Sequence, residues 1–193
     1  MNKLYTNGTD RWLSPPELVQ ALGPFDMDPC CEPWMPWRTA TRMLSLPPED
    51  GQVINGQFEA GSIVPSDPRW NDSFAKSEIT DGLLELWEGR VWMNHPYSCG
   101  LPWAEAMAEH NRGIALTAAK SMDTRWGQCF LENCSLALFL AGCILFHYPD
   151  GTKSTGKWLP NALWAFGEED AEILLSLTKQ HPEYSGVYMR RVK

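Results

Sequence analysis

Short runs of continuously apolar sequence constrain the fold of this chain more than any other feature. They cover residues 90–94, 114–119 and 161–167, and a longer run over 136–148 is interrupted at Gly142. Strands that are buried on both faces have this pattern, whereas strands with one exposed face alternate apolar and polar residues. Helix-like segments separate the runs, so the sequence predicts an α/β fold with a mainly parallel central sheet.

Helix signals lie between and around these runs. The first helix is expected to follow Ser14, a favoured N-cap residue, with Pro15 in its first turn, and to end at Gly23. Its expected apolar face consists of Leu18, Val19 and Leu22. Three further helices are predicted: LPWAEAMAEHNRG, closed by Gly113 with Trp103, Ala106 and Met107 on one side; TRWGQCFLENC; and EEDAEILLSLTKQH.

The remaining sequence is divided into short strands and loops. FDMDPCC predicts a strand that ends at Asp28, GVYMRRV predicts a further strand, and residues 32–44 are expected to be mostly irregular. Residues 45–80 are rich in Pro and Gly and are predicted to be an inserted loop or recognition segment, with Val53-Ile54 and 62–64 as a hairpin. At 193 residues, the chain is predicted to be one domain, 1–193.

Composition limits the classes of partner and compartment. The formal net charge of −8 argues against a large non-specific nucleic-acid surface, because phosphate contacts need Lys and Arg. The charge does not exclude a local basic groove. The residues that could form one are Arg38, Arg42, Arg69, Lys120, Arg125, Lys153, Lys157, Arg190, Arg191 and Lys193. No run has the length of a membrane span, and no secretory signal precedes the six cysteines, so we expect a cytoplasmic protein with reduced thiols. The cysteine spacing does not favour a zinc site, and no metal is expected.

Two unusual motifs fall at the carboxyl ends of predicted strands. Asp28-Pro29 follows the strand of FDMDPCC, and the tetrapeptide NHPY, which begins at Asn94, follows the run 90–94. In open α/β sheets, ligands bind outside the carboxyl ends of the strands. The placement of both motifs therefore predicts an active site at this edge of the sheet.

The tetrapeptide contains the groups needed to alkylate an exocyclic amine. The lone pair of such an amine is conjugated into its ring, so the enzyme must accept hydrogen bonds from the N–H groups. The side-chain oxygen of Asn94 and the carbonyl of His95 are suitable acceptors, and Pro96 fixes the loop. Tyr97 can stack on a base that has left the duplex. The methyl donor would be S-adenosylmethionine (AdoMet), although the usual Gly-rich loop after the first strand is absent. The alternative interpretation is an ordinary strand-to-helix turn.

Taken together, several motifs resemble the phage and prophage Dam-type DNA N6-adenine methyltransferases. They are WLSPPELVQAL, FDMDPCC, DGLLELWEGRVWMNHPYS, ALTAAKSMDTRWGQCF, FLAGCILF and LPNALWAFG, in this order over most of the chain outside 45–80. The resemblance implies a Rossmann-like AdoMet-dependent methyltransferase fold. It also implies a phage-encoded, site-specific enzyme of the host cytoplasm that methylates the N6 amine of an adenine flipped out of double-stranded DNA.

The same resemblance implies roles for individual residues. It implies that Asn94, Pro96 and Tyr97 act in methyl transfer, with the carbonyl of His95 beside them. The implied cofactor-binding residues are Ser14, Pro15, Asp28, Pro29, Cys30 and Asp81. The implied substrate-binding residues are Ser98, Asp123, Thr124 and Trp126. Asp81 is equally well interpreted as a turn residue before Gly82, and residues 123–126 as an N-cap with helix packing.

The sequence also departs from the family pattern and leaves other functions open. His95 stands where the family has a Pro, and FLAGCILF lacks a basic residue that the family has. One alternative is a methyltransferase-fold protein that has lost catalysis and binds protein or nucleic acid. Another is an amino-methyltransferase that acts on cytosine N4 or on a protein glutamine.

Overall fold

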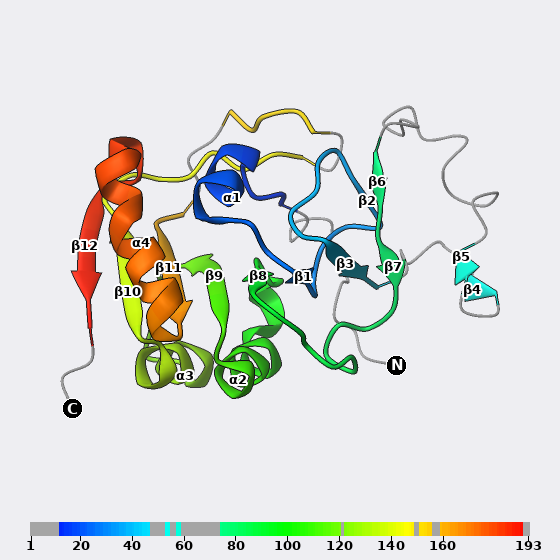
Figure 1. Cartoon of the computed structure of the whole chain (residues 1–193), viewed down its shortest axis with the longest axis horizontal. Coiled ribbons are helices and arrows are strands. Elements are labelled where there is room, and N and C mark those ends of the chain that lie inside the picture. Colours follow the sequence, from blue (N-terminus) through cyan, green and yellow to red (C-terminus); the bar gives the residue numbers. More distant parts are fainter. Residues whose placement is uncertain are drawn as a thin grey trace.

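An eight-stranded sheet forms the centre of the molecule (Figure 1). The computed structural model describes residues 12–46, 53–54, 57–58, 74–120, 122–148, 151–155 and 159–190. The strands of the sheet are β1 (Met27–Asp28), β3 (Arg42–Ser45), β7 (Glu78–Ile79), β8 (Val91–Met93), β9 (Gly113–Ala118), β10 (Leu136–Leu140), β11 (Asn161–Phe166) and β12 (Gly186–Met189). Their order in space is β12-β10-β11-β9-β8-β1-β3-β7.

The sheet is parallel over five adjacent strands. The pairs β9·β8, β8·β1, β1·β3 and β3·β7 are parallel, whereas β9·β11, β11·β10 and β10·β12 are antiparallel. The expected α/β fold with a mainly parallel sheet is confirmed. The antiparallel direction of β11 between β9 and β10 was not predicted, because a continuous apolar strand has the same pattern in either direction.

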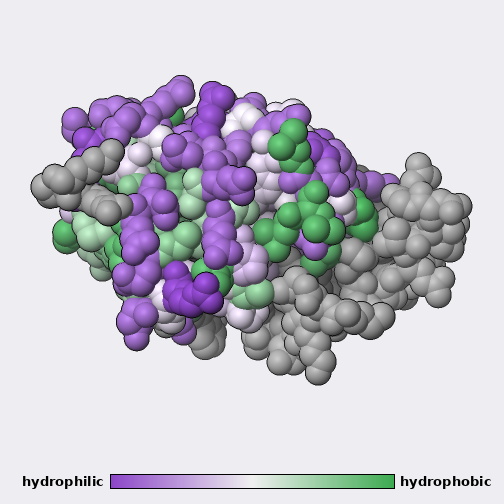
Figure 2. Space-filling view, turned by 90° about the horizontal axis from the view of Figure 1, so that it is seen from below, coloured by the Kyte–Doolittle hydropathy of each residue, from purple (hydrophilic) through white to green (hydrophobic). Residues whose placement is uncertain are grey.

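Helices cover both faces of the sheet and so bury the two side-chain sets of the central strands β8, β9 and β11. α1 (Pro16–Leu22) and α4 (Glu168–Gln180) lie on one face, and their apolar residues share a core with Trp92 of β8. α2 (Gly100–His110) and α3 (Arg125–Asn133) lie on the other, in a core with Val91 and Met93. Successive residues of a strand point to opposite faces, so β8 must be apolar at every position. Seen from below, much of the outer surface is hydrophilic (Figure 2).

Several predicted boundaries are wrong by a few residues. α1 begins after Pro15, which is its N-cap, and Ser14 is buried without capping the helix. α2 ends at Asn111, whose left-handed φ of 52° closes it before Gly113 begins β9. Its buried face contains Ala104 beside Trp103 and Met107, in place of the expected Ala106.

Short strands account for the larger differences. Residues 32–44 contain β2 (Trp34–Met35) and the start of β3, although this segment was predicted to be irregular. Within 45–80, β7 joins the central sheet and β6 (Ala75–Lys76) pairs with β2. β4 (Val53–Ile54) pairs with β5 (Gln57–Phe58), so the expected strand at 53–54 is correct with a different partner, and 62–64 lie outside the described residues.

The run 136–148 contains one strand of the sheet, not two. β10 ends at Leu140, and beyond Gly142 only His147 forms isolated bridges, to Leu13 and Lys153. Among the described residues, no helix is both long enough and apolar enough to cross a membrane.

Candidate functional site

The carboxyl ends of β1 and β8 meet where the strand order changes direction. From β1 the chain continues to β3 on one side, whereas β8 lies on the other side of β1 and is followed outward by β9. A parallel sheet leaves a crevice at such a point, because the connections of its two halves run away from each other. Asp28 ends β1 and Asn94 directly follows β8, so the two motifs singled out from the sequence meet at this crevice.

A small cavity occupies the crevice. It offers about 40 Å³ to the centres of water-sized molecules, which is room for a few waters. Its lining consists of Trp12, Leu13, Ser14, Asp28, Cys30, Cys31, Glu32, Met35, Thr39, Trp92, Asn94 and Pro96. Five of the predicted site residues therefore share one cavity: Ser14, Asp28, Cys30, Asn94 and Pro96.

Asp28 places a buried carboxyl in this cavity. Its Oδ1 accepts a hydrogen bond from the Cys30 amide (3.1 Å), and its Oδ2 accepts one from the Thr39 hydroxyl (2.5 Å). Burial removes water from the carboxylate and raises the pKa of Asp28 to about 6, against the lowering effect of these hydrogen bonds. A cation bound in the cavity would favour the ionised form, so the group is suited to a positively charged ligand.

The two neighbouring cysteines are protonated thiols. Burial raises the pKa of Cys30 and of Cys31 well above the ordinary value, and the charge of Asp28 adds to both shifts. A hydrogen bond from the backbone amide of Asn94 lowers the pKa of Cys30 in part, which places that thiol against the loop after β8. Cys31 Sγ donates to the carbonyl of Leu44 on β3 (3.1 Å). The thiols thus join the ends of β1, β3 and β8.

The half-buried Asn94 is held in one orientation. Its Nδ2 donates to the backbone carbonyl of Trp12 (2.9 Å), and its Oδ1 lies 3.5 Å from the Tyr97 hydroxyl, which donates to it. A carbonyl oxygen can only accept, so the atom facing Trp12 must be the amide nitrogen. The planar amide therefore turns its oxygen to the other side, as an acceptor.

The side chain of His95 points away from the cavity into the core. Its ring stacks on Phe130 with centroids 6.1 Å apart and meets Trp126 and Tyr97 edge-on. Nδ1 lies 3.0 Å from the Pro96 carbonyl and donates to it. The imidazole is thus part of an aromatic cluster under α3. His95 does not line the cavity, and the expected use of its carbonyl stays a prediction.

The other predicted site residues lie around the cavity without lining it. Pro15 borders a second, larger cavity of about 330 Å³ at the start of α1. Asp81 forms a turn in which its Oδ1 accepts from the Leu83 amide (3.0 Å), and the adjacent Gly82 lies directly against the Pro29 carbonyl. The interpretation of Asp81 as a turn residue is confirmed. Its expected place near a bound adenosine stays a prediction.

The four predicted substrate-binding residues are spread over two segments. Ser98 is exposed in the short helix η1 (Tyr97–Cys99), and Asp123 is exposed before α3. Thr124 caps α3, accepting from the Gly127 amide at 3.3 Å, and Trp126 packs against His95. The N-cap interpretation of this segment is confirmed, and its contact with the loop after β8 places α3 beside the site.

Seven cavity residues were not among the predicted site residues: Trp12, Leu13, Cys31, Glu32, Met35, Thr39 and Trp92. Trp12 acts through its backbone carbonyl, Thr39 reaches Asp28 from a loop expected to be irregular, and Glu32 follows the two cysteines. Trp12 belongs to the motif WLSPPELVQAL, which draws attention to its side chain. The sequence gives no indication that its backbone carbonyl would contact Asn94. Comparison with protein-family models, curated proteins and solved structures finds no match to this chain.

Proposed function

We propose that this protein is an AdoMet-dependent methyltransferase that acts on the N6 amine of adenine in DNA. The orientation of Asn94 carries the proposal. Its amide nitrogen is engaged by Trp12, so its oxygen is the acceptor presented after β8, beside the buried carboxyl of Asp28. Asn94, an acceptor for an amine, and Asp28, a carboxyl for a cation, thus lie together where the strand order of the sheet changes direction.

The lining of the crevice fits the chemistry of this cofactor, which is cationic and supplies an electrophilic methyl group. Asp28 would face its positive charge, because the buried carboxylate gains more from a cation than from any neutral ligand. The cavity of about 40 Å³ is smaller than the whole cofactor, so it would hold only the part of the cofactor that carries the charge.

At the acceptor side, the chain would work by positioning. Asn94 Oδ1 and the carbonyl of His95 accept the two N–H hydrogen bonds of the amine and leave its lone pair directed at the methyl group. Pro96 is buried and lacks an N–H, so it fixes the loop without offering a competing donor. The Tyr97 ring, held over Asn94 by its hydroxyl, would stack on the flipped base.

Substitution of Asn94 by Ala tests this proposal. Loss of the acceptor should lower methyl transfer to duplex DNA at least about a hundredfold, by analogy with the loss of one preorganised hydrogen bond in other enzymes. Radiolabelled AdoMet gives the rate, and Asn133→Ala at an exposed position of α3 is the matched control. An unchanged rate for Asn94→Ala would exclude this role. Base-resolved mapping of the product separates adenine N6 from cytosine N4, and a labelled protein would indicate a glutamine acceptor.

The second candidate is a methyltransferase-like protein that binds without catalysis. The small cavity and the glycine-free loop after β1 favour it, since close approach of backbone to a cofactor usually needs glycine. Calorimetry with AdoMet distinguishes the two. Binding supports the enzyme, and absence of heat at millimolar AdoMet supports the binding protein.

A further inference from the structure

We infer that the backbone carbonyl of Trp12 is the positioning group of this site. It determines that the oxygen of the Asn94 amide, and not its nitrogen, meets the amine that is to be methylated. The inference deepens the proposed function and rests on it for its catalytic meaning. The contact itself joins two segments 82 residues apart in the chain.

The position of Trp12 is itself fixed by an isolated antiparallel bridge outside the central sheet. Leu13 and His147 exchange two backbone hydrogen bonds of 2.9 Å, and His147 also bridges to Lys153. The Trp12 ring lies 5.2 Å from the ring of Tyr148. The segment at Trp12 is therefore held by contacts that are independent of the loop bearing Asn94.

The amide would have two equivalent orientations without this contact. Turning the amide over would present its NH₂ group to an amine, and two donors cannot form a hydrogen bond. The Trp12 carbonyl excludes that orientation, because the amide oxygen would then face another acceptor at 2.9 Å. The chain thus selects the reactive orientation in the free protein, before any substrate binds.

A carboxyl at position 94 tests the contact directly. Asn94→Asp keeps the shape of the side chain but puts an oxygen against the Trp12 carbonyl. That oxygen can form a hydrogen bond only while it is protonated, so the introduced carboxyl should titrate at least about one pH unit above the ordinary aspartate value. Carbon-13 NMR of the labelled carboxyl measures this shift.

Other groups near position 94 must be separated from the effect. They are Asp28 at the end of β1, Cys30, Cys31 and Glu32 after it, and His95 and Tyr97 on the loop after β8. The double variant Asn94→Asp with Asp28→Asn removes the carboxylate most buried in the cavity. A raised pKa in both variants supports the inference, and an ordinary value in either one overturns it.

Asn133→Asp is the matched control. Asn133 also donates to a backbone carbonyl, that of Cys129 at 2.8 Å, but it is exposed, so its replacement should titrate near the ordinary aspartate value. The wild-type protein offers a second measurement if the position 94 variants do not fold. The side-chain amide protons of Asn94 should exchange slowly with solvent, and rapid exchange would overturn the inference.

The NMR measurements need no methyl transfer, so the two proposals can fail separately. An inactive wild-type protein with a raised pKa in the variants rejects the proposed function and retains the positioning contact. An active wild-type enzyme with an ordinary pKa in the variants does the reverse.

Discussion

At the residue scale, burial of the Asp28 carboxyl, a proposed binding group, lowers the stability of the folded protein at neutral pH. Its carboxyl is fully buried on the end of β1, and its two oxygens accept from Cys30 and Thr39. These hydrogen bonds do not offset the loss of water, since the pKa is raised to about 6. The folded state therefore binds a proton more tightly than the unfolded chain does. The contribution of Asp28 to stability therefore falls as pH rises from about 4 to about 6 and is constant above that.

Asp28→Asn should consequently stabilise the protein at neutral pH. The shift of about two pH units corresponds to an upper limit of about 3 kcal/mol, and we expect about 1–3 kcal/mol at pH 7 with little gain at pH 4. Urea unfolding at the two pH values measures the difference. Asp123→Asn, at an exposed position, should change stability by less than about 0.5 kcal/mol. Equal stability of wild type and Asp28→Asn at pH 7 would contradict the assigned cost of burial.

Individual site residues differ in how far the sequence could predict them. Asn94 and Asp28 were predicted because each ends an apolar run, and the carboxyl ends of parallel strands meet at one edge. Trp12 could not be predicted, since its contribution is a backbone carbonyl and any residue has one. The direction of the His95 ring was equally hidden, because it depends on aromatic residues of α3 and β11.

At the scale of elements, one glycine fixes how closely α2 approaches α3. A β-carbon on Gly100 would lie 3.0 Å from Trp126 Cγ and 3.2 Å from His95 Cε1. Gly100→Ala should therefore destabilise the protein by about 1–3 kcal/mol through overpacking, although its backbone is helical. Thermal unfolding checks this value. Gly142→Ala, where a β-carbon meets nothing within 4 Å, should have almost no effect. Similar losses in both variants would show that packing against α3 is not the cause.

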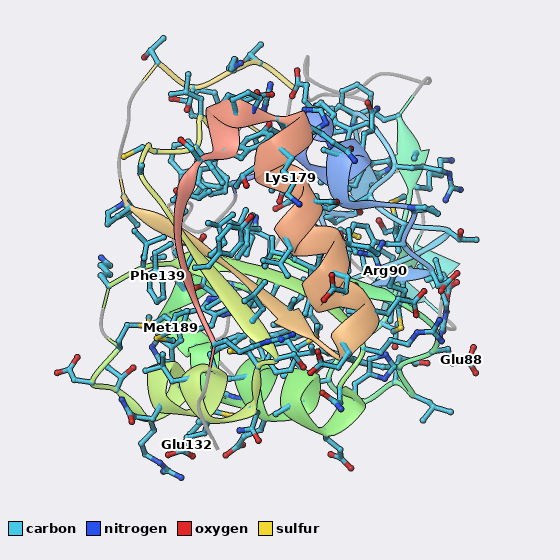
Figure 3. The ribbon with its side chains drawn as sticks, turned by 60° about the vertical axis from the view of Figure 1, so that its left-hand side comes forward. Glu88, Arg90, Glu132, Phe139, Lys179 and Met189 are labelled. Carbon is cyan, nitrogen blue, oxygen red and sulfur yellow. The ribbon has the colours of Figure 1, made fainter. Side chains whose placement is uncertain are left out.

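A buried ion pair joins four elements at the opposite edge of the sheet. Arg90 Nε lies 2.6 Å from Asp170 Oδ1, its Nη1 donates to the carbonyls of Leu22 and Pro24, and Asp170 Oδ2 accepts from the Gly113 amide. Arg90 lies beside α4 in Figure 3. The pair thus connects α1, β8, β9 and α4 through groups that solvent does not reach.

Removal of one partner should leave an uncompensated buried charge. Asp170→Ala is expected to lower the free energy of unfolding by about 3–5 kcal/mol. The exposed pair of Arg190 and Glu168, at 2.6 Å, provides the comparison, and Glu168→Ala should cost less than about 1 kcal/mol. Chemical denaturation measures both. Comparable losses would contradict the role given to burial.

Long elements were predicted more reliably than short ones, although the two-residue strands β1 and β4 were also expected. α4 and the strands of five or six residues have enough repeats for their pattern to be read, and they were predicted within a few residues. β2 and β7 have two residues each and have no periodicity of their own. Their existence depends on the strands beside them, so the sequence alone described their segments as irregular.

At the scale of the whole molecule, the two edges of the sheet differ in what they offer to a nucleic acid. Lys120 and Arg125 are exposed after the carboxyl end of β9, on the edge that bears Asn94. Arg112 is exposed before the amino end of the same strand. An acidic protein that binds DNA must use few phosphate contacts, and these should lie on the edge with the site.

Under the proposed function, replacing Lys120 and Arg125 by Glu should therefore weaken binding to duplex DNA about tenfold or more. The slope of log affinity against log salt should fall by up to about two, one for each lost phosphate contact. Fluorescence anisotropy with a duplex at several salt concentrations measures both quantities. Arg112→Glu makes the same kind of change on the other edge, and an equal loss in that variant would show that net charge alone is responsible.

The overall class of the fold followed from apolar runs alone, because burial on both faces leaves few alternatives to a covered sheet. The position of β11 did not follow. That strand lies between β9 and β10, yet it comes after both in the sequence. The composition of a strand does not indicate which two strands lie beside it in the sheet.

This late strand has a consequence for the order in which the molecule is made. During synthesis, β9 and β10 leave the ribosome before their common neighbour exists, and each then carries an unpaired edge. A nascent chain that stalls before residue 161 would leave one edge of β9 and both edges of β10 unpaired, because β12 is also absent. Residues 161–190, which supply β11 and β12, thus cover these edges, and their synthesis, rather than formation of the parallel strands, completes the sheet.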